Sequence, residues 1–232
     1  MTIAQIQDLG VIPYEPAWQL QRELLEQRVD DKIADRFLLC EHTPVITMGK
    51  SGKQKNLLVS ADELRRRGVD YFEVERGGDL TYHGPGQLVG YPIFKLARLR
   101  EVQGFVRKME ESIIRALASF DVVGERRSDH PGVFVGGAKV ASIGAAVRRG
   151  VTYHGFALDV CTDLSYYMLI NPCGMPEVAV TTIAREANRE ISVADVKPVI
   201  RSAFEDVFGL RFEDMGAQSP TPEPTAMVAK GA

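Results

Sequence analysis

Two short turns restrict most strongly how this chain can fold. Gly136-Gly137 separates the apolar runs GVFV and AKVAS, and Arg149-Gly150 comes directly before VTYHGFALDV. A two-residue connection that contains glycine is typical of a β-hairpin, whose two strands run antiparallel. The sequence therefore predicts an α+β fold, in which helices pack against a mixed, largely antiparallel sheet.

Apolar spacing and end signals predict the helices. Apolar residues recur along one helical face in residues 16–30 and 102–120, and the second segment has the stripe expected of a central helix. Ser60 followed by Glu63 has the form of a capping box, and Ser192 is a predicted cap of the last helix. Further strand-like pieces occupy residues 35–42, 69–76 and 87–94.

Length and composition indicate one globular unit. The 232 residues include 45% hydrophobic and 25% charged residues, and we expect one catalytic domain over residues 1–215. Residues 216–232 contain three prolines and no aromatic residue, which predicts a disordered tail.

Charge and cysteine content narrow the class of protein. A net charge of -3 gives no reason to expect a nucleic-acid partner. No apolar stretch is long enough to span a membrane, and the first residues do not resemble a secretory signal. Three cysteines, an odd number without close pairing, fit reduced thiols in the cytoplasm.

The segment RGGDLTYHGPGQ, residues 76–87, has more glycine and charge than a simple turn needs. It contains five glycines and prolines among Arg, Asp, Thr, Tyr and His side chains. Glycines let backbone N–H groups approach a ligand closely, so we favour a binding loop over a long irregular turn. The segment matches neither a Walker A loop nor a dinucleotide-binding fingerprint.

Two further segments carry isolated polar groups. Lys139 is one charge in the small and apolar run GGAKVASIGAAV, and most such lysines point outward from a strand. His154 lies beside a glycine inside an apolar strand, where a hydrogen-bonded structural histidine is the usual interpretation.

Cys173, in INPCGM, stands between a proline and a glycine rather than inside an apolar run. A zinc site is disfavoured because the chain has no C-x-x-C and only four scattered histidines. Cys40 ends the apolar run FLLC and is the better candidate for a buried filler. A nucleophile is therefore the leading interpretation of Cys173.

Together, RGGDLTYHGPGQ, GGAKVASIG, TYHGFAL and INPCGM resemble the lipoyl(octanoyl) transferases, in the same order along the chain. The resemblance implies the fold shared by biotin protein ligases and lipoate ligases. It also implies transfer of an octanoyl group from octanoyl-acyl carrier protein to a lysine of lipoyl domains. Those acceptors belong to the E2 subunits of 2-oxo acid dehydrogenases and to the glycine cleavage H protein. No cofactor or metal is implied.

The resemblance assigns roles residue by residue. The acyl-thioester cysteine of the family corresponds to Cys173 and its partner lysine to Lys139. The resemblance and the local sequence together give these substrate-binding candidates: Arg76, Gly77, Gly78, Asp79, Leu80, Thr81, Tyr82, His83, Ser142, Ile143, Gly144, His154, Gly155, Phe156 and Ala157. His83 and His154 are expected to shape the site. Asp159 departs from the family, which has asparagine there.

The chemistry of such a transfer fits a cysteine beside a lysine. A free cysteine with a pKa near 8.5 would be only about 3% thiolate at pH 7. A nearby ammonium favours the thiolate, so we hypothesise that Lys139 lowers the pKa of Cys173 and then relays a proton. An ATP-dependent lipoate or biotin-type ligase, a non-catalytic acyl-chain binder and a cysteine hydrolase remain alternatives.

Overall fold

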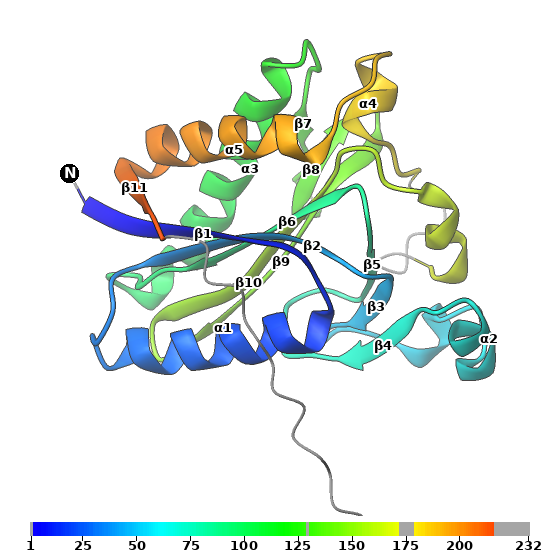
Figure 1. Cartoon of the computed structure of the whole chain (residues 1–232), viewed down its shortest axis with the longest axis horizontal. Coiled ribbons are helices and arrows are strands. Elements are labelled where there is room, and N and C mark those ends of the chain that lie inside the picture. Colours follow the sequence, from blue (N-terminus) through cyan, green and yellow to red (C-terminus); the bar gives the residue numbers. More distant parts are fainter. Residues whose placement is uncertain (1, 129, 172–178, 216–232) are drawn as a thin grey trace, which may run out of the picture.

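The computed structural model describes residues 2–128, 130–171 and 179–215. An eight-stranded sheet forms its centre, in the order β11-β1-β2-β6-β10-β9-β8-β7 (Figure 1). From β2 to β7 every neighbouring pair is antiparallel, whereas β1 is parallel to both β2 and β11. The predicted mixed, largely antiparallel sheet is confirmed. Its strands are β1 (Thr2–Ile12), β2 (Arg36–His42), β6 (Gln87–Ile93), β7 (Glu125–Arg126), β8 (Gly132–Val135), β9 (Ala138–Arg148), β10 (Val151–Asp159) and β11 (Leu210–Asp214).

Both predicted hairpins are present. Gly136 and Gly137 have φ angles of 54° and 83° and connect β8 to β9. Arg149 and Gly150 have φ angles of 50° and 83° and connect β9 to β10. Positive φ at both central positions matches the twist of the flanking strands, and only glycine adopts it without steric cost.

Helices cover both faces of the sheet. In Figure 1, α3 and α5 lie on one face and α1 lies on the other. The central helix predicted from the apolar stripe is α3. Its apolar face is buried, and Met109 and Ile113 are fully inaccessible. Among the described residues, no helix combines the length and apolar character needed to cross a membrane. The helices are α1 (Tyr14–Val29), α2 (Ala61–Arg66), α3 (Val102–Ala118), α4 (Ile183–Glu186) and α5 (Val193–Phe208), with 3₁₀ turns η1 (Gln54–Asn56), η2 (Leu99–Glu101) and η3 (Leu164–Leu169).

The two predicted caps differ in how completely they form. Ser192 and Asp195 bond reciprocally at the start of α5, which is a full capping box. At α2 the Ser60 hydroxyl accepts from the Glu63 N–H, but the Glu63 carboxylate pairs with Arg66 and Arg67 instead. The box expected at Ser60 is therefore only half formed.

A second sheet, in the order β4-β3-β5, stands beside the end of the large one (Figure 1). Its strands are β3 (Val45–Met48), β4 (Asp70–Glu73) and β5 (Leu80–His83). β5 lies inside the segment 76–87 and pairs antiparallel with β3. The segment predicted as a binding loop therefore contains a short strand, because the backbone of LTYH pairs with β3, which is distant in sequence.

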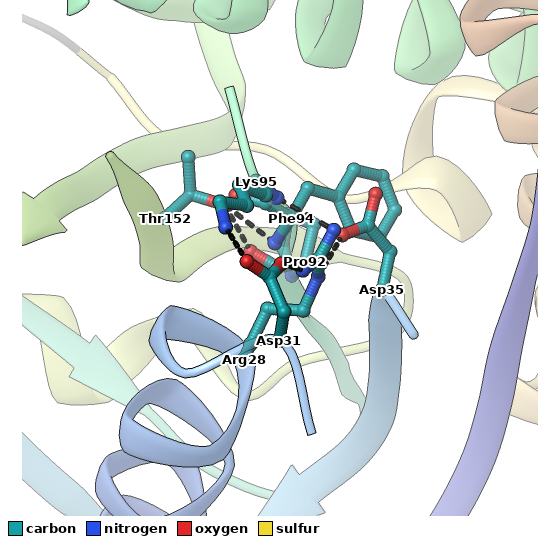
Figure 2. A network of polar contacts seen from close by, with 7 residues as sticks. All are labelled: Arg28, Asp31, Asp35, Pro92, Phe94, Lys95 and Thr152. Carbon is teal, nitrogen blue, oxygen red and sulfur yellow. Dashed lines mark hydrogen bonds and ion pairs between the residues drawn. The ribbon is translucent and has the colours of Figure 1, made fainter. Parts of the chain in front are cut away.

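A polar network fastens the end of α1 to the sheet (Figure 2). Arg28 Nε lies 2.7 Å from Asp35 Oδ1, and the Lys95 backbone N–H donates to the same oxygen at 3.0 Å. Asp31 contacts both Arg28 and the Lys95 ammonium. The Thr152 hydroxyl of β10 donates to the Pro92 carbonyl of β6 at 2.7 Å. These contacts link α1, β2, β6 and β10, and α1, β6 and β10 also contribute residues to the site described next.

The predicted single domain over residues 1–215 stays a prediction. The tail 216–232 lies outside the described residues.

Candidate active site

A cavity of about 690 Å³ lies where the two sheets meet. Its walls come from β5, β6, β9 and β10, from the first residue of α1, and from the segment before η1. Fourteen of the fifteen predicted substrate-binding residues line it: Arg76, Gly77, Gly78, Asp79, Leu80, Thr81, His83, Ser142, Ile143, Gly144, His154, Gly155, Phe156 and Ala157. The remaining one, Tyr82, is buried instead against Tyr166, with ring centroids 4.7 Å apart.

The charged side chains of the segment 76–79 hold the wall of the cavity. Arg76 is buried and donates to the Thr47 carbonyl at 2.6 Å and to the Thr47 hydroxyl at 3.0 Å. Asp79 accepts from the backbone N–H groups of Lys53 and Leu80, and from the amide of Asn56. A buried charge is stable only when it is hydrogen-bonded in this way. These two residues therefore anchor the loop on β3 and on η1.

The glycines of β9 and β10 allow backbones to meet closely at the cavity. Gly144 and Gly155 are directly opposite each other in the β9–β10 register. A Cβ atom at Gly144 would lie 3.0 Å from the Gly77 carbonyl oxygen, and one at Gly155 would lie 2.2 Å from that of Gly90. Any larger residue at Gly155 would push β10 away from β6.

Lys139 lies in the cavity wall and is 6% exposed. Its Nζ is 5.5 Å from the centroid of the Phe134 ring. A Cβ atom at Gly132 would lie 3.3 Å from Lys139 Cε, so glycine leaves space for the lysine stem. The Gly132 N–H donates to the fully buried Glu110 at 3.1 Å, which fixes the backbone beside that stem.

Cys173 lies outside the described residues, which resume at Ala179. The described residues on either side of this gap both contact the site. Asn171 lines the cavity, and its N–H donates to the Asn56 carbonyl at 2.7 Å. The Ala179 carbonyl accepts from the Lys139 N–H at 2.8 Å, and the Thr181 N–H donates back to the Lys139 carbonyl at 2.9 Å.

The buried histidines beside the cavity are neutral. His83 Nδ1 donates to Gln87 Oε1 at 2.8 Å, and burial, reinforced by His42 and Arg76, lowers the pKa of His83 well below its usual value. His42 donates to the Ile12 carbonyl and accepts from the Tyr91 hydroxyl, and burial lowers its pKa to about 4. Neutral imidazoles give this part of the cavity hydrogen-bonding groups without charge.

His154 differs from the structural histidine expected at its position. It has a positive φ of 52°, and its backbone N–H donates to Gln21 Oε1 at 2.9 Å. Among the described residues, its buried Nε2 has no hydrogen-bond partner, since Glu75 Oε2 is 3.7 Å away. His154 thus lines the cavity, and its Nε2 lies near the Glu75 carboxylate at more than hydrogen-bond distance.

Asp159 ends β10 as a buried acid. Gln87 Nε2 donates to Asp159 Oδ1 at 2.9 Å, and the Tyr167 hydroxyl donates to Oδ2 at 3.1 Å. Burial raises the pKa of Asp159 to about 6, and the donors from Gln87, Thr162 and Tyr167 oppose this only in part. The carboxylate thus links β6 to η3, the turn that leads to Asn171.

This raised pKa makes stability depend on pH. The folded protein binds the Asp159 proton more tightly than the unfolded chain does. The stability that this bound proton contributes is therefore fully present below about pH 4, and it is lost as pH rises through about 6. We expect Asp159→Asn to gain about 2–3 kcal/mol in unfolding free energy relative to the parent protein between pH 4 and pH 7. Urea unfolding of both proteins across this range measures the difference. A constant difference would contradict a buried, titrating Asp159.

Sequence reasoning missed several residues that line the cavity: Tyr14, Ser51, Lys53, Lys55, Asn56, Val89, Tyr91, Val106, His130, Pro131, Ala145 and Asn171. Five of them belong to helices and strands and look like ordinary core residues: Tyr14, Val89, Tyr91, Val106 and Ala145. Tyr14, for example, stacks on His83 with ring centroids 6.1 Å apart. One signal was available, because GKSGKQKN, residues 49–56, combines glycines with charged side chains, as the segment 76–87 also does.

Residues 13–205 match the family model of the lipoyl protein ligase A/B catalytic domain. The chain belongs to this family. Octanoyltransferases are similar to it over most of their length: the one from Dictyoglomus thermophilum is 46% identical over 198 residues, covering 85% of this chain and 84% of the relative. The one from Rubrobacter xylanophilus is 46% identical over 202 residues, covering 86% and 91%. This member of the lipoyl protein ligase A/B family is accordingly an acyltransferase, and the predicted resemblance is confirmed.

Solved structures confirm the predicted fold. A bi-partite lipoate protein ligase from Thermoplasma acidophilum superimposes with a TM-score of 0.76 at 15% identity, covering 93% of this chain and 87% of that chain. A lipoate-protein ligase A bound with ATP gives 0.76 at 15% identity, covering 91% and 88%. Biotin protein ligase from Aquifex aeolicus is more distant, with a TM-score of 0.51 at 11% identity, covering 90% and 70%. At identities of 11–15%, these structures show the fold of this chain only.

Proposed function

We propose that this acyltransferase moves an octanoyl group from octanoyl-acyl carrier protein to a lysine of lipoyl domains, through a thioester on Cys173. The acceptors are the lipoyl domains of 2-oxo acid dehydrogenase E2 subunits and the glycine cleavage H protein, and the reaction belongs to lipoate biosynthesis in the cytoplasm. The identity to octanoyltransferases supports the acyl group.

One observation carries the proposed mechanism: the chain on both sides of Cys173 meets the surroundings of Lys139. Asn171 lines the same cavity as Lys139, and Ala179 is hydrogen-bonded to the Lys139 backbone. Cys173 is two residues beyond Asn171, and two residues of chain span at most about 7 Å. This short connection supports a cysteine and a lysine that act together.

The reaction then has two steps. The Cys173 thiolate attacks the donor thioester carbonyl, the carrier thiol leaves, and an octanoyl thioester forms on the enzyme. The acceptor amine attacks this thioester, an amide forms, and the proton of the amine passes to the departing Cys173 sulfur. Lys139 favours the thiolate in the first step and relays the proton in the second. A thioester is converted to an amide, so no nucleotide is needed.

The cavity offers apolar surface for the hydrocarbon chain. Ile143, Phe156 and Ala157 line it together with Val89. Each buried methylene contributes about 0.8 kcal/mol, so two methylenes distinguish octanoyl from hexanoyl by roughly tenfold. Because Phe156 and Ala157 are nearly inaccessible, the chain would occupy a surface that is already shielded from water.

The test is incubation with octanoyl-acyl carrier protein and an apo lipoyl domain in the absence of ATP, followed by intact mass measurement. We expect an octanoyl adduct on the acceptor and a transient one on the enzyme. Cys173→Ala should abolish both, whereas Cys161→Ala, which removes an exposed thiol, should leave transfer intact. Transfer that requires ATP and a free acid would show a ligase instead, and release of free octanoate would show a hydrolase.

A further inference from the structure

Three lysines lie in the segment that contributes Ser51, Lys53, Lys55 and Asn56 to the cavity wall, and we call them the lysine rim: Lys50, Lys53 and Lys55. All three are exposed, and Lys53 and Lys55 line the cavity. Residues 49–58 contain no acidic residue, although the whole chain has a net charge of -3. Among the residues that the structure describes, no ion pair joins these ammonium groups to a carboxylate. The rim is a positive surface on an acidic protein.

The backbone under the lysine rim is held in place. The N–H groups of Lys50 and Ser51 donate to the Arg76 and Gly78 carbonyls at 3.0 and 3.1 Å. The Lys53 N–H donates to Asp79 Oδ1 at 3.1 Å, and the same carboxylate accepts from the Leu80 N–H and the Asn56 amide. The backbone that carries Lys50 and Lys53 is therefore held by hydrogen bonds to the segment 76–79, which favours recognition over a mobile, solvated loop.

Two large apolar side chains lie exposed on the chain segments next to the rim. Leu58 is 59% exposed and Met168 is 78% exposed. The Leu58 N–H donates to the Leu169 carbonyl at 2.9 Å, so the two segments are neighbours. An apolar centre with charged residues around it is the usual composition of a protein docking surface, and methionine adapts well to a partner.

We propose that the lysine rim, with Leu58 and Met168, is the docking surface for an acidic carrier protein that delivers the acyl thioester. This inference rests on the proposed function and adds the place and the charge of the donor. The donor must present its acyl group at the cavity that Lys53 and Lys55 line. An acidic donor matches the positive charge of the rim. Complementary charge would act mainly by steering the encounter.

The experiment compares two octanoyl donors in the first half-reaction, followed by the mass of the octanoylated enzyme. One donor is octanoyl-acyl carrier protein, and the other is octanoyl-N-acetylcysteamine, a small uncharged thioester. The readout is the ratio of kcat/KM for the carrier-bound donor to that for the small donor. The rim variant is Lys50→Glu with Lys53→Glu. The control makes the same charge change at two exposed lysines elsewhere, Lys32 beside the end of α1 and Lys108 on α3.

We expect the ratio to fall at least tenfold in the rim variant and less than twofold in the control. For the parent protein, raising the salt concentration should slow the carrier-bound donor much more than the small one. A rim variant within twofold of the parent, or an equal fall in both variants, would overturn the docking surface. The docking surface would also be overturned if the rim variant were impaired mainly in the transfer from the octanoylated enzyme to the lipoyl domain. If the parent accepts neither donor, the proposed function itself is wrong.

Discussion

Replacing Lys139 by Met is expected to lower octanoyl transfer by about 10²–10⁴-fold, the range that a positioned acid–base group contributes. Methionine keeps the length of the side chain in a cavity wall where Lys139 is 6% exposed, but it removes the charge and the exchangeable proton. The loss should appear in both half-reactions, because the ammonium serves thiolate formation first and proton relay second. Intact mass measurement at short times separates the two steps.

Alkylation of Cys173 isolates the electrostatic part of this effect. If the Lys139 ammonium lowers the pKa of the thiol, the alkylation rate of Lys139→Met should rise with pH only near the value of about 8.5 for a free cysteine. The parent protein should react at lower pH. The experiment is best done with Cys161→Ala in both proteins, because Cys161 is exposed and would also react. Identical pH profiles would show that Lys139 does not control the thiol.

Replacing Gly155 by Ala is expected to cost about 3 kcal/mol or more of unfolding free energy. The added Cβ would lie 2.2 Å from the Gly90 carbonyl oxygen and 2.7 Å from Pro92 Cδ. Both are parts of the β6 backbone or its proline ring, so neither can rotate away, and β10 must separate from β6. Urea unfolding followed by circular dichroism measures the loss.

Gly104→Ala is the matched control for this prediction. Gly104 lies in α3, is exposed, and has no atom within 4 Å of an added Cβ. Alanine there should stabilise the protein by up to about 1 kcal/mol, because it lowers the backbone freedom of the unfolded chain. Equal effects of the two substitutions would contradict the close approach of β10 and β6 as the reason for Gly155.

Local signals predicted the elements well where the physical cause is local. Gly136-Gly137 and Arg149-Gly150 make hairpins because their φ angles are positive, and Ser192 with Asp195 caps α5 through neighbouring backbone groups. The first strand, Thr2–Ile12, was not predicted. It is stabilised by β2 and β11, which lie far along the chain, and so leaves little local signal.

Motif comparison predicted which residues gather at the site, but not how they are used. Asp79 was expected to bind substrate, yet its carboxylate accepts from Lys53, Asn56 and Leu80. Tyr82 belongs to the same motif but does not line the cavity, because its ring packs against Tyr166. A motif records which residues are present, whereas their partners come from other strands.

By itself, the sequence determined the hairpins, the longer helices and the family, and it predicted a lysine and a cysteine that act together. Only the tertiary structure decided that Tyr14, Lys53 and Asn171 share a cavity with Lys139, and that Asp159 is a buried acid held by Gln87 and Tyr167. The reason is physical. Turn and cap preferences depend on neighbours along the chain, while a cavity, a raised pKa and a charged rim depend on segments that only packing brings together.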